Sequence, residues 1–321
     1  MSIPSPSSPT AASHAAGRTL VVLNPKAGQD DLGTLRRKLG GAFAARAAPF
    51  DLVESERSGH ATELAREAAR AGYRAVCVVG GDGTIAEVAT GLVGTGVPLA
   101  VVPRGTANQL ARNLGIPLGL EAAVEVALNG EPSPIDLGQI DGRAFALVAG
   151  AGFDAAVMAG ATRERKERWG FAAYIYSALK EALSVAPARF EITADDHRLE
   201  VSAVSVMIAN GGALFLKYLP VRLPLTPTPL SSWTDGLFDV VIVAPRRFPD
   251  WAGVLWSAAR RRFAGSDRLI HLHARTVRVV TDPPVPTQVD GDVAGMTPIT
   301  ARVLEGGARV LLPRKPSTGK R

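Results

Sequence analysis

One stretch constrains the fold more than any other: an apolar run at residues 75–79 leads into Gly80-Gly81-Asp82-Gly83-Thr84. The run predicts a buried strand, and the residues from about Ile85 to Leu92 predict an amphipathic helix. Glycines between a strand and a helix let backbone N–H groups approach an anion at the positive end of the helix dipole. A carboxylate there suits a metal ion that bridges to phosphate. We therefore expect the turn to hold a nucleotide polyphosphate; the alternative is a tight turn whose Asp or Thr caps the helix.

Two further polar, glycine-bearing loops follow predicted strands. The loop Asn24-Pro25-Lys26-Ala27-Gly28-Gln29 comes after a strand at 18–23, and residues 103–112 come after a strand at 98–102. Another strand is predicted at 50–53 and helices at 32–43, 59–71 and 120–128. This alternation of strands and helices predicts a parallel sheet with right-handed crossovers. Because ligands of such sheets bind at the carboxyl ends of the strands, the three loops should converge on one site.

From about residue 133 the chain consists of short apolar runs separated by Gly, Asp and Pro, which predicts a second, mostly antiparallel β domain. We expect a disordered leader at 1–17, an α/β domain at 18–132, a β-sandwich-type domain at 133–313 and a flexible basic tail at 314–321. Helices are predicted within the second domain at about 169–183 and 249–263. Its predicted strands are 135–139, 143–149, 189–193, 198–209, 237–243, 269–273, 276–281, 287–289 and 309–312.

The composition bears on partners and compartment. The formal charge is +6, aromatic residues make up 6%, and no motif that reads RNA or DNA is present. These features argue against nucleic acid and favour an anionic membrane surface, although arginines spread over a solvated surface would give the same charge. No run approaches the ~20 apolar residues of a membrane span. The single cysteine, Cys77, lies in a predicted strand, which excludes a disulfide framework and fits a reducing cytoplasm.

We therefore expect a cytoplasmic protein in peripheral contact with a membrane. Two segments could face lipid. Residues 251–263 combine aromatic and arginine side chains, as in a helix that lies on a membrane or packs its aromatics on the sandwich. Residues 211–230 are apolar and poor in charge, as in the lining of an acyl-chain tunnel or a buried loop. The sequence leaves the oligomeric state open, a homodimer included.

Six ordered blocks carry a family resemblance. They are Asn24-Pro25-Lys26-Ala27-Gly28, Gly80-Gly81-Asp82-Gly83-Thr84, Pro103-Arg104-Gly105-Thr106-Ala107-Asn108, Ile135-Asp136-Leu137-Gly138, Asp235-Gly236-Leu237-Phe238-Asp239 and Asp290-Gly291-Asp292. With them, residues 18–313 resemble the diacylglycerol kinase catalytic family, which includes bacterial lipid kinases and sphingosine kinases. The resemblance implies a phosphofructokinase-like nucleotide domain, a C-terminal β-sandwich and an active site in the cleft between them. It also implies Mg²⁺-dependent transfer of the ATP γ-phosphoryl group to a lipid hydroxyl such as that of diacylglycerol.

The resemblance also implies residue roles. Asp82 would organise Mg²⁺ and phosphate, and Asp292 would be the general base that takes the proton from the lipid hydroxyl. A second, structural metal ion would be held by Asp235 and the carbonyls of Ser232 and Leu237. The expected ATP contacts are Asn24, Pro25, Lys26, Ala27, Gly28, Ser55, Gly81, Asp82, Gly83, Thr84, Glu87 and Thr106.

The sequence departs from the family pattern at four positions. Asp292 stands where glutamate is common, so that the cleft must close further or the base must act through water. Gln29 replaces a frequent lysine and Gln109 a frequent aspartate, which fits an ion pair replaced by an amide pair. Ala86 replaces a frequent asparagine and removes one hydrogen bond.

Other interpretations stay open. The chain could be an NAD kinase or another small-molecule kinase, or a nucleotide- and lipid-binding regulatory protein without turnover. Asp235-Gly236 and Asp290-Gly291-Asp292 are also turn sequences. His271 and His273 fall on one face of a predicted strand, where a structural role is favoured over metal binding. The sequence does not name the lipid.

Overall fold

The structure, a computed structural model, describes residues 15–28, 31–152, 187–215, 222–224, 233–245, 250 and 268–314. The helix predicted at 169–183 lies outside these residues, as do nearly all of the helix predicted at 249–263 and much of the apolar stretch 211–230. The chain divides into two compact units. The first comprises Met1–Ile135 and Gly306–Arg321, and the second comprises Asp136–Glu305.

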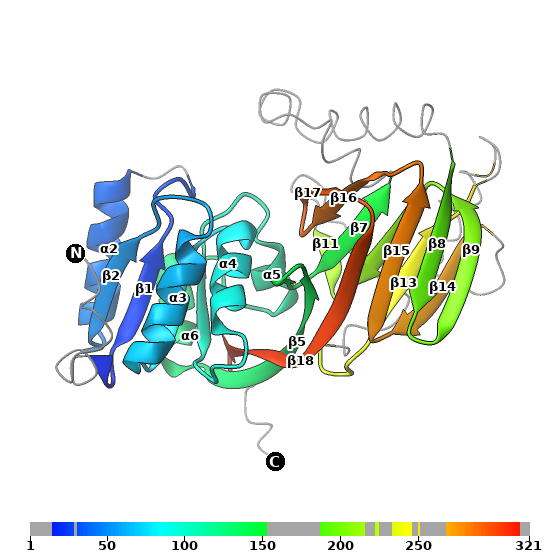
Figure 1. Ribbon diagram of the computed structural model, residues 1–321. Helices are drawn as coiled ribbons and strands as arrows, with labels where there is room; N and C mark the ends of the chain where they lie inside the picture. Colours follow the sequence, from blue (N-terminus) through cyan, green and yellow to red (C-terminus); the bar gives the residue numbers. More distant parts are fainter. Residues whose placement is uncertain are drawn as a thin grey trace, which may run out of the picture. The chain divides into compact units, whose positions relative to one another are not determined.

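The first unit is built on a parallel sheet with the strand order β2-β1-β3-β4. Every residue of β1, β3 and β4 is buried, as expected for parallel strands that helices cover on both faces. Figure 1 shows α3 and α4 side by side. The elements are β1 (Thr19–Leu23), α2 (Leu32–Ala44), β2 (Phe50–Glu54), α3 (His60–Ala71), β3 (Ala75–Gly80), α4 (Asp82–Leu92), β4 (Leu99–Pro103), α5 (Gln109–Asn113) and α6 (Leu120–Asn129).

Successive side chains of the central strands point to opposite faces of the sheet, and one set packs against α2 and α6. Cys77 belongs to this core, is fully buried, and burial raises the pKa of its thiol to about 12. It is therefore a packing residue, as the sequence predicts, and not a nucleophile. The core also contains Val21, Leu23, Leu35, Leu39, Ala42, Phe43, Ala75, Val79, Ala100, Val102, Ala123, Val124, Ala127 and Leu311.

The second unit is a sandwich of two sheets. One sheet has the order β14-β13-β10-β7-β16-β17 and is antiparallel; in the other, β15 pairs with β18 and β8, and β8 with β9 (Figure 1). Phe190 and Ile192 from one sheet and Val240 and Ile242 from the other share one buried core. The strands from residue 131 onward, of which β5 and β18 begin or end in the first unit and β11 and β12 pair in a separate sheet, are β5 (Glu131–Ile140), β6 (Arg143–Phe145), β7 (Val148–Gly152), β8 (Ala188–Ala194), β9 (His197–Ala203), β10 (Ser205–Ala209), β11 (Ala213–Phe215), β12 (Arg222–Pro224), β13 (Phe238–Val243), β14 (Leu269–Ala274), β15 (Thr276–Asp282), β16 (Pro286–Val289), β17 (Asp292–Met296) and β18 (Ile299–Leu312).

The predicted fold class, a parallel α/β domain followed by a β-sandwich, is confirmed. Several boundaries differ from the predictions. Helix α4 begins at Asp82 rather than Ile85, and α5 begins inside the segment 103–112, which the sequence predicts as loop. Each of the strands predicted at 143–149 and 198–209 is two strands. Strand β18 starts ten residues before the strand predicted at 309–312, and its last part lies in the first unit, where Val310 pairs with Leu99 of β4.

Candidate functional site

A cavity of about 430 Å³ lies in the first unit, where β1, β2, β3 and β4 end. Its volume is within the range of small-molecule sites, ~300–1,000 Å³. Of the predicted nucleotide contacts, Pro25 and Asp82 are not among the lining residues. Those that line it are Asn24, Lys26, Ala27, Gly28, Ser55, Gly81, Gly83, Thr84, Glu87 and Thr106. The convergence of the three loops that the sequence predicts is therefore present in the structure.

The N-terminus of α4 faces this cavity through Gly81, Gly83 and Thr84. Gly81 is the N-cap residue in an extended conformation, and no side chain makes a capping hydrogen bond there. The first backbone N–H groups of an α-helix have no partner within the helix. They and the helix dipole therefore make the floor of the cavity suited to an anion.

Asn24 joins the first loop to this helix. Its Nδ2 donates to Thr84 Oγ1 at 2.8 Å, while its Oδ1 accepts from the Lys26 backbone N–H at 2.9 Å. The Asn24 amide thus donates to the second loop through its nitrogen and accepts from its own loop through its oxygen. This arrangement fixes the position of the Thr84 hydroxyl on the cavity wall.

Asp82 joins the second loop to the third. One carboxylate oxygen accepts from the backbone N–H of Gln109 and the other from that of Leu110, both at 3.0 Å. These N–H groups belong to the first residues of α5, so Asp82 holds the start of that short helix. The carboxylate that the sequence assigns to metal and phosphate therefore also sets the geometry of the loop that carries Thr106.

Glycines allow the second and third loops to touch. A Cβ atom on Gly105 would lie 2.6 Å from the Cα of Gly81, closer than real Cβ contacts come. The Arg104 N–H donates to the Gly80 carbonyl at 2.8 Å, and the Gly105 N–H donates to Asn108 Oδ1 at 2.7 Å. Backbone contact at Gly81 and Gly105 thus sets the width of the cavity between these loops.

Gly105→Ala is expected to push these two loops apart. Overpacking of this kind costs ~1–3 kcal/mol, and we expect the affinity for a nucleotide to fall roughly 10- to 100-fold. Isothermal titration calorimetry measures it. The matched control is Gly41→Ala on the exposed side of α2, where an added Cβ meets nothing within 4 Å. That variant should be up to ~1 kcal/mol more stable and bind as the wild type does; unchanged binding in Gly105→Ala would contradict the packing account.

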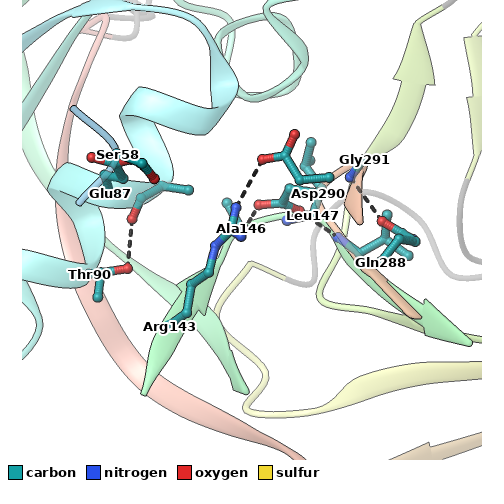
Figure 2. Close-up of polar contacts among 12 residues, drawn as sticks. Ser58, Glu87, Thr90, Arg143, Ala146, Leu147, Gln288, Asp290 and Gly291 are labelled. Atoms are coloured by element: carbon teal, nitrogen blue, oxygen red, sulfur yellow. Dashed lines mark hydrogen bonds and ion pairs between the residues drawn. The ribbon is translucent and has the colours of Figure 1, made fainter. Parts of the chain in front are cut away.

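The far wall of the cavity comes from residues that follow β2. The Ser58 hydroxyl lies 3.4 Å from Glu87 Oε1 (Figure 2). The Ala61 N–H donates to Glu87 Oε2 at 3.3 Å. The sequence predicts Ser55 here but not Glu56, Arg57 or Ser58. The rule that ligands bind at strand ends could have found them, since they follow β2 as the predicted loops follow β1, β3 and β4.

In the second unit the turn 290–292 carries two carboxylates with different surroundings. Asp290 accepts backbone hydrogen bonds from the N–H groups of Ala146 and Leu147 (Figure 2) and from that of Val148, each at 2.9 Å. Asp292 begins β17, its side chain is 61% exposed, and one of its oxygens lies 3.0 Å from Arg143 Nη2. Asp290 therefore holds the turn together, and Asp292 is the carboxylate that a reactant can reach.

The turn around Asp235 is held from within its own unit. Asp235 Oδ1 accepts from the Leu237 N–H at 3.1 Å, and the buried Asp136 accepts from the Gly236 N–H at 2.8 Å. Asp136, which lies 100 positions earlier in the sequence, thus supports the turn that follows Asp235. Ser232, the third predicted metal ligand, lies outside the described residues. The metal site at this turn stays a prediction.

No helix among the residues that the structure describes is long and apolar enough to span a bilayer.

Comparisons with known proteins agree with the two units. A model of the diacylglycerol kinase catalytic domain matches residues 18–140, and a model of the YegS C-terminal NAD kinase beta sandwich-like domain matches residues 147–312. The diacylglycerol kinase of Bacillus subtilis is 30% identical over 263 residues, 80% of this chain and 84% of that protein. The crystal structure of a diacylglycerol kinase from Bacillus anthracis superposes with a TM-score of 0.73 at 26% identity, covering 92% of this chain and 97% of that one.

One relative is considerably longer. The Synechocystis protein sll0036 is 31% identical over 240 residues, which are 73% of this chain and 54% of that protein. The chain therefore spans about half the length of that relative.

Proposed function

This chain belongs to the diacylglycerol kinase catalytic family, and from that premise we propose that it is an ATP-dependent lipid kinase. The reaction would transfer the γ-phosphoryl group of ATP to a hydroxyl of diacylglycerol or a related lipid. The observation that carries the proposal is the cavity at the N-terminus of α4, which three glycine-bearing loops enclose. Phosphoryl transfer depends mainly on positioning and charge neutralisation, and such a cavity supplies both.

The residues present fit the triphosphate of ATP. A side chain at Gly105 would fill the space between the loops, so the cradle depends on backbone N–H groups rather than side chains. Lys26 adds a positive charge to the wall, and the Thr84 hydroxyl is held in place by Asn24. Glu87, Ser55 and Thr106 supply polar groups for the rest of the nucleotide.

The carboxylates present also fit Mg²⁺, which prefers oxygen ligands and, when bound, neutralises charge on the phosphates. Asp82 would orient the metal and phosphate, because a carboxylate oxygen that accepts one backbone hydrogen bond, as each oxygen of Asp82 does, has a further lone pair to offer. Asp235, with the carbonyls of Leu237 and Ser232, would hold a second, structural ion.

Asp292 would act as the general base toward the lipid hydroxyl. It is exposed, and Arg143 beside it fixes the orientation of its carboxylate. The hydroxyl becomes acidic only as it attacks, so a carboxylate is a suitable acceptor for its proton. The formal charge of +6 would favour peripheral contact with an anionic membrane, where the lipid resides.

The test is a transfer assay with γ-phosphate-labelled ATP and Mg²⁺. Parallel reactions contain micelles with diacylglycerol, micelles with a sphingoid base, lipid-free micelles, or NAD as soluble acceptor. We expect label in the lipid phase only when a hydroxylated lipid is present. Formation of NADP instead would establish the soluble-kinase alternative. ATP binding without transfer to any acceptor would establish a regulatory protein without turnover and overturn the proposal.

A further inference from the structure

Three potential metal ligands meet on one face of the antiparallel sheet of the second unit. Asp239 lies in β13, and His271 and His273 lie in the neighbouring strand β14. The Nε2 atom of His271 is 2.6 Å from Asp239 Oδ1, and that of His273 is 3.1 Å from the same oxygen. Their potential ligand atoms all lie within 4.8 Å of one another.

The alternation of side chains along each strand and the register between β13 and β14 explain why the three side chains lie together. Val240 and Ile242 of β13 point into the sandwich core, so Asp239 between the core positions points to the opposite face. His271 and His273 are two residues apart and therefore share a face of β14. The pairing places His273 directly opposite Asp239 and His271 opposite Val241, on the same side. Asp239 and His271 are 32 positions apart, so this proximity cannot be seen in the sequence.

The three side chains differ in their exposure to solvent. The Asp239 side chain is 5% exposed, that of His271 16% and that of His273 45%. The two imidazole rings meet edge to face with their centroids 4.7 Å apart. A carboxylate taken this far from water needs partners that compensate its charge, and its oxygen faces two nitrogens that can either donate a proton or ligate a cation.

The spacing suits a metal ion. With ligand bonds of ~2.1 Å, two ligand atoms of a tetrahedral site lie ~3.4 Å apart and two neighbouring ligands of an octahedral site ~3.0 Å apart. For a tetrahedral ion, the observed separations from the Asp239 oxygen, 2.6 Å for His271 and 3.1 Å for His273, would open by about 0.8 and 0.3 Å; for an octahedral ion, only the His271 separation would open, by about 0.4 Å. Rotation of the two imidazole rings would supply this movement.

We propose that Asp239, His271 and His273 form a binding site for a divalent transition-metal ion, with Zn²⁺ as the best fit. Imidazole nitrogens select such ions over Mg²⁺ and Ca²⁺, which prefer all-oxygen ligands. Three protein ligands leave a fourth position, which water can fill from the side of the exposed His273. The ion would cross-link β13 to β14 and would be separate in chemistry from the all-oxygen site expected at Asp235.

The test uses the full chain after treatment with a chelator, titrated with Zn²⁺ in calorimetry and with Co²⁺ in absorption spectroscopy. The expected result is one Zn²⁺ per chain, undisplaced by excess Mg²⁺, and a Co²⁺ spectrum of low coordination number. His273→Ala changes an exposed side chain, so the fold should survive, and it should weaken Zn²⁺ binding by at least ~100-fold. Neither measurement depends on catalytic activity.

The control is His197→Ala, an exposed histidine on β9 in the other sheet, which should bind Zn²⁺ as the wild type does. Asp239→Asn keeps the shape of the side chain and should also weaken binding by at least ~100-fold. The proposal is overturned if wild-type protein binds no stoichiometric Zn²⁺, or if His273→Ala and Asp239→Asn bind it with wild-type affinity. Either of these results would leave the cluster as a hydrogen-bonded link between two strands.

Discussion

Asp82→Ala is expected to lower kcat/KM for phosphoryl transfer by ~10³-fold or more, since it removes a group that positions both metal and phosphate. The structure gives a second reason. Without the carboxylate, the N–H groups of Gln109 and Leu110 lose the acceptors that hold the start of α5. Each unsatisfied group costs ~1–3 kcal/mol where it is buried, so the third loop should shift. Steady-state kinetics with a lipid acceptor and calorimetric ATP binding measure the two consequences.

A loss of kcat/KM in Asp82→Ala must be distinguished from a general loss of stability. Asp31→Ala is the matched control, because Asp31 caps α2 by accepting from the Thr34 N–H at 2.8 Å and is exposed. It should cost ~1 kcal/mol of stability and leave kcat/KM unchanged. Asp82→Asn should fall between alanine and wild type, since the amide keeps one acceptor and opposes its NH₂ to a backbone N–H. Wild-type kinetics in Asp82→Ala would remove this residue from the mechanism.

In the turn 290–292, substitution of one carboxylate should affect turnover and substitution of the other should affect stability. Asp292→Asn should reduce kcat by ~10²–10⁴-fold, the usual range for loss of a general base. It should hardly change stability, because its ion pair with Arg143 is exposed and such pairs contribute ~0–1 kcal/mol. Asp290→Asn should instead lower the melting temperature, since it weakens three backbone hydrogen bonds to a carboxylate.

Thermal unfolding and single-turnover kinetics on both variants measure this pair. Asp292→Glu adds a third arm: it keeps the carboxylate with one more methylene and should retain turnover. Full activity in Asp292→Asn would show that another group accepts the proton. A drop in melting temperature for Asp292→Asn as large as that for Asp290→Asn would show that the two carboxylates share one structural role.

Much of the fold could be predicted because periodicity and strand-end chemistry are local. The apolar run before Gly80 could be buried only as a strand between helices, and β3 is buried throughout. The course of β18 could not be predicted in this way. Its pairing of Val310 with Leu99 joins residues more than 200 positions apart, and no local pattern encodes such a partner.

In the site, too, some features follow from the local sequence and others depend on contacts between distant residues. The glycine loops are visible in the sequence because their backbone must approach an anion closely. The hydrogen bonds that Asp82 accepts from Gln109 and Leu110 are not visible in the sequence, because they depend on the short helix α5, whose start looks like loop. Nor can sequence spacing pair Asp239 with His273, since the β13–β14 register decides that contact.

A lipid kinase transfers the γ-phosphoryl group of ATP to a lipid, and this transfer can be followed directly. The most direct measurement is mass spectrometry of a mixed membrane lipid extract after incubation with the protein, Mg²⁺ and ATP labelled with heavy oxygen in its γ-phosphate. One or more lipid species should each gain a single labelled phosphoryl group with the wild-type protein, and none should do so with Asp82→Ala. Label found only in water-soluble products, with ATP bound and consumed, would contradict it.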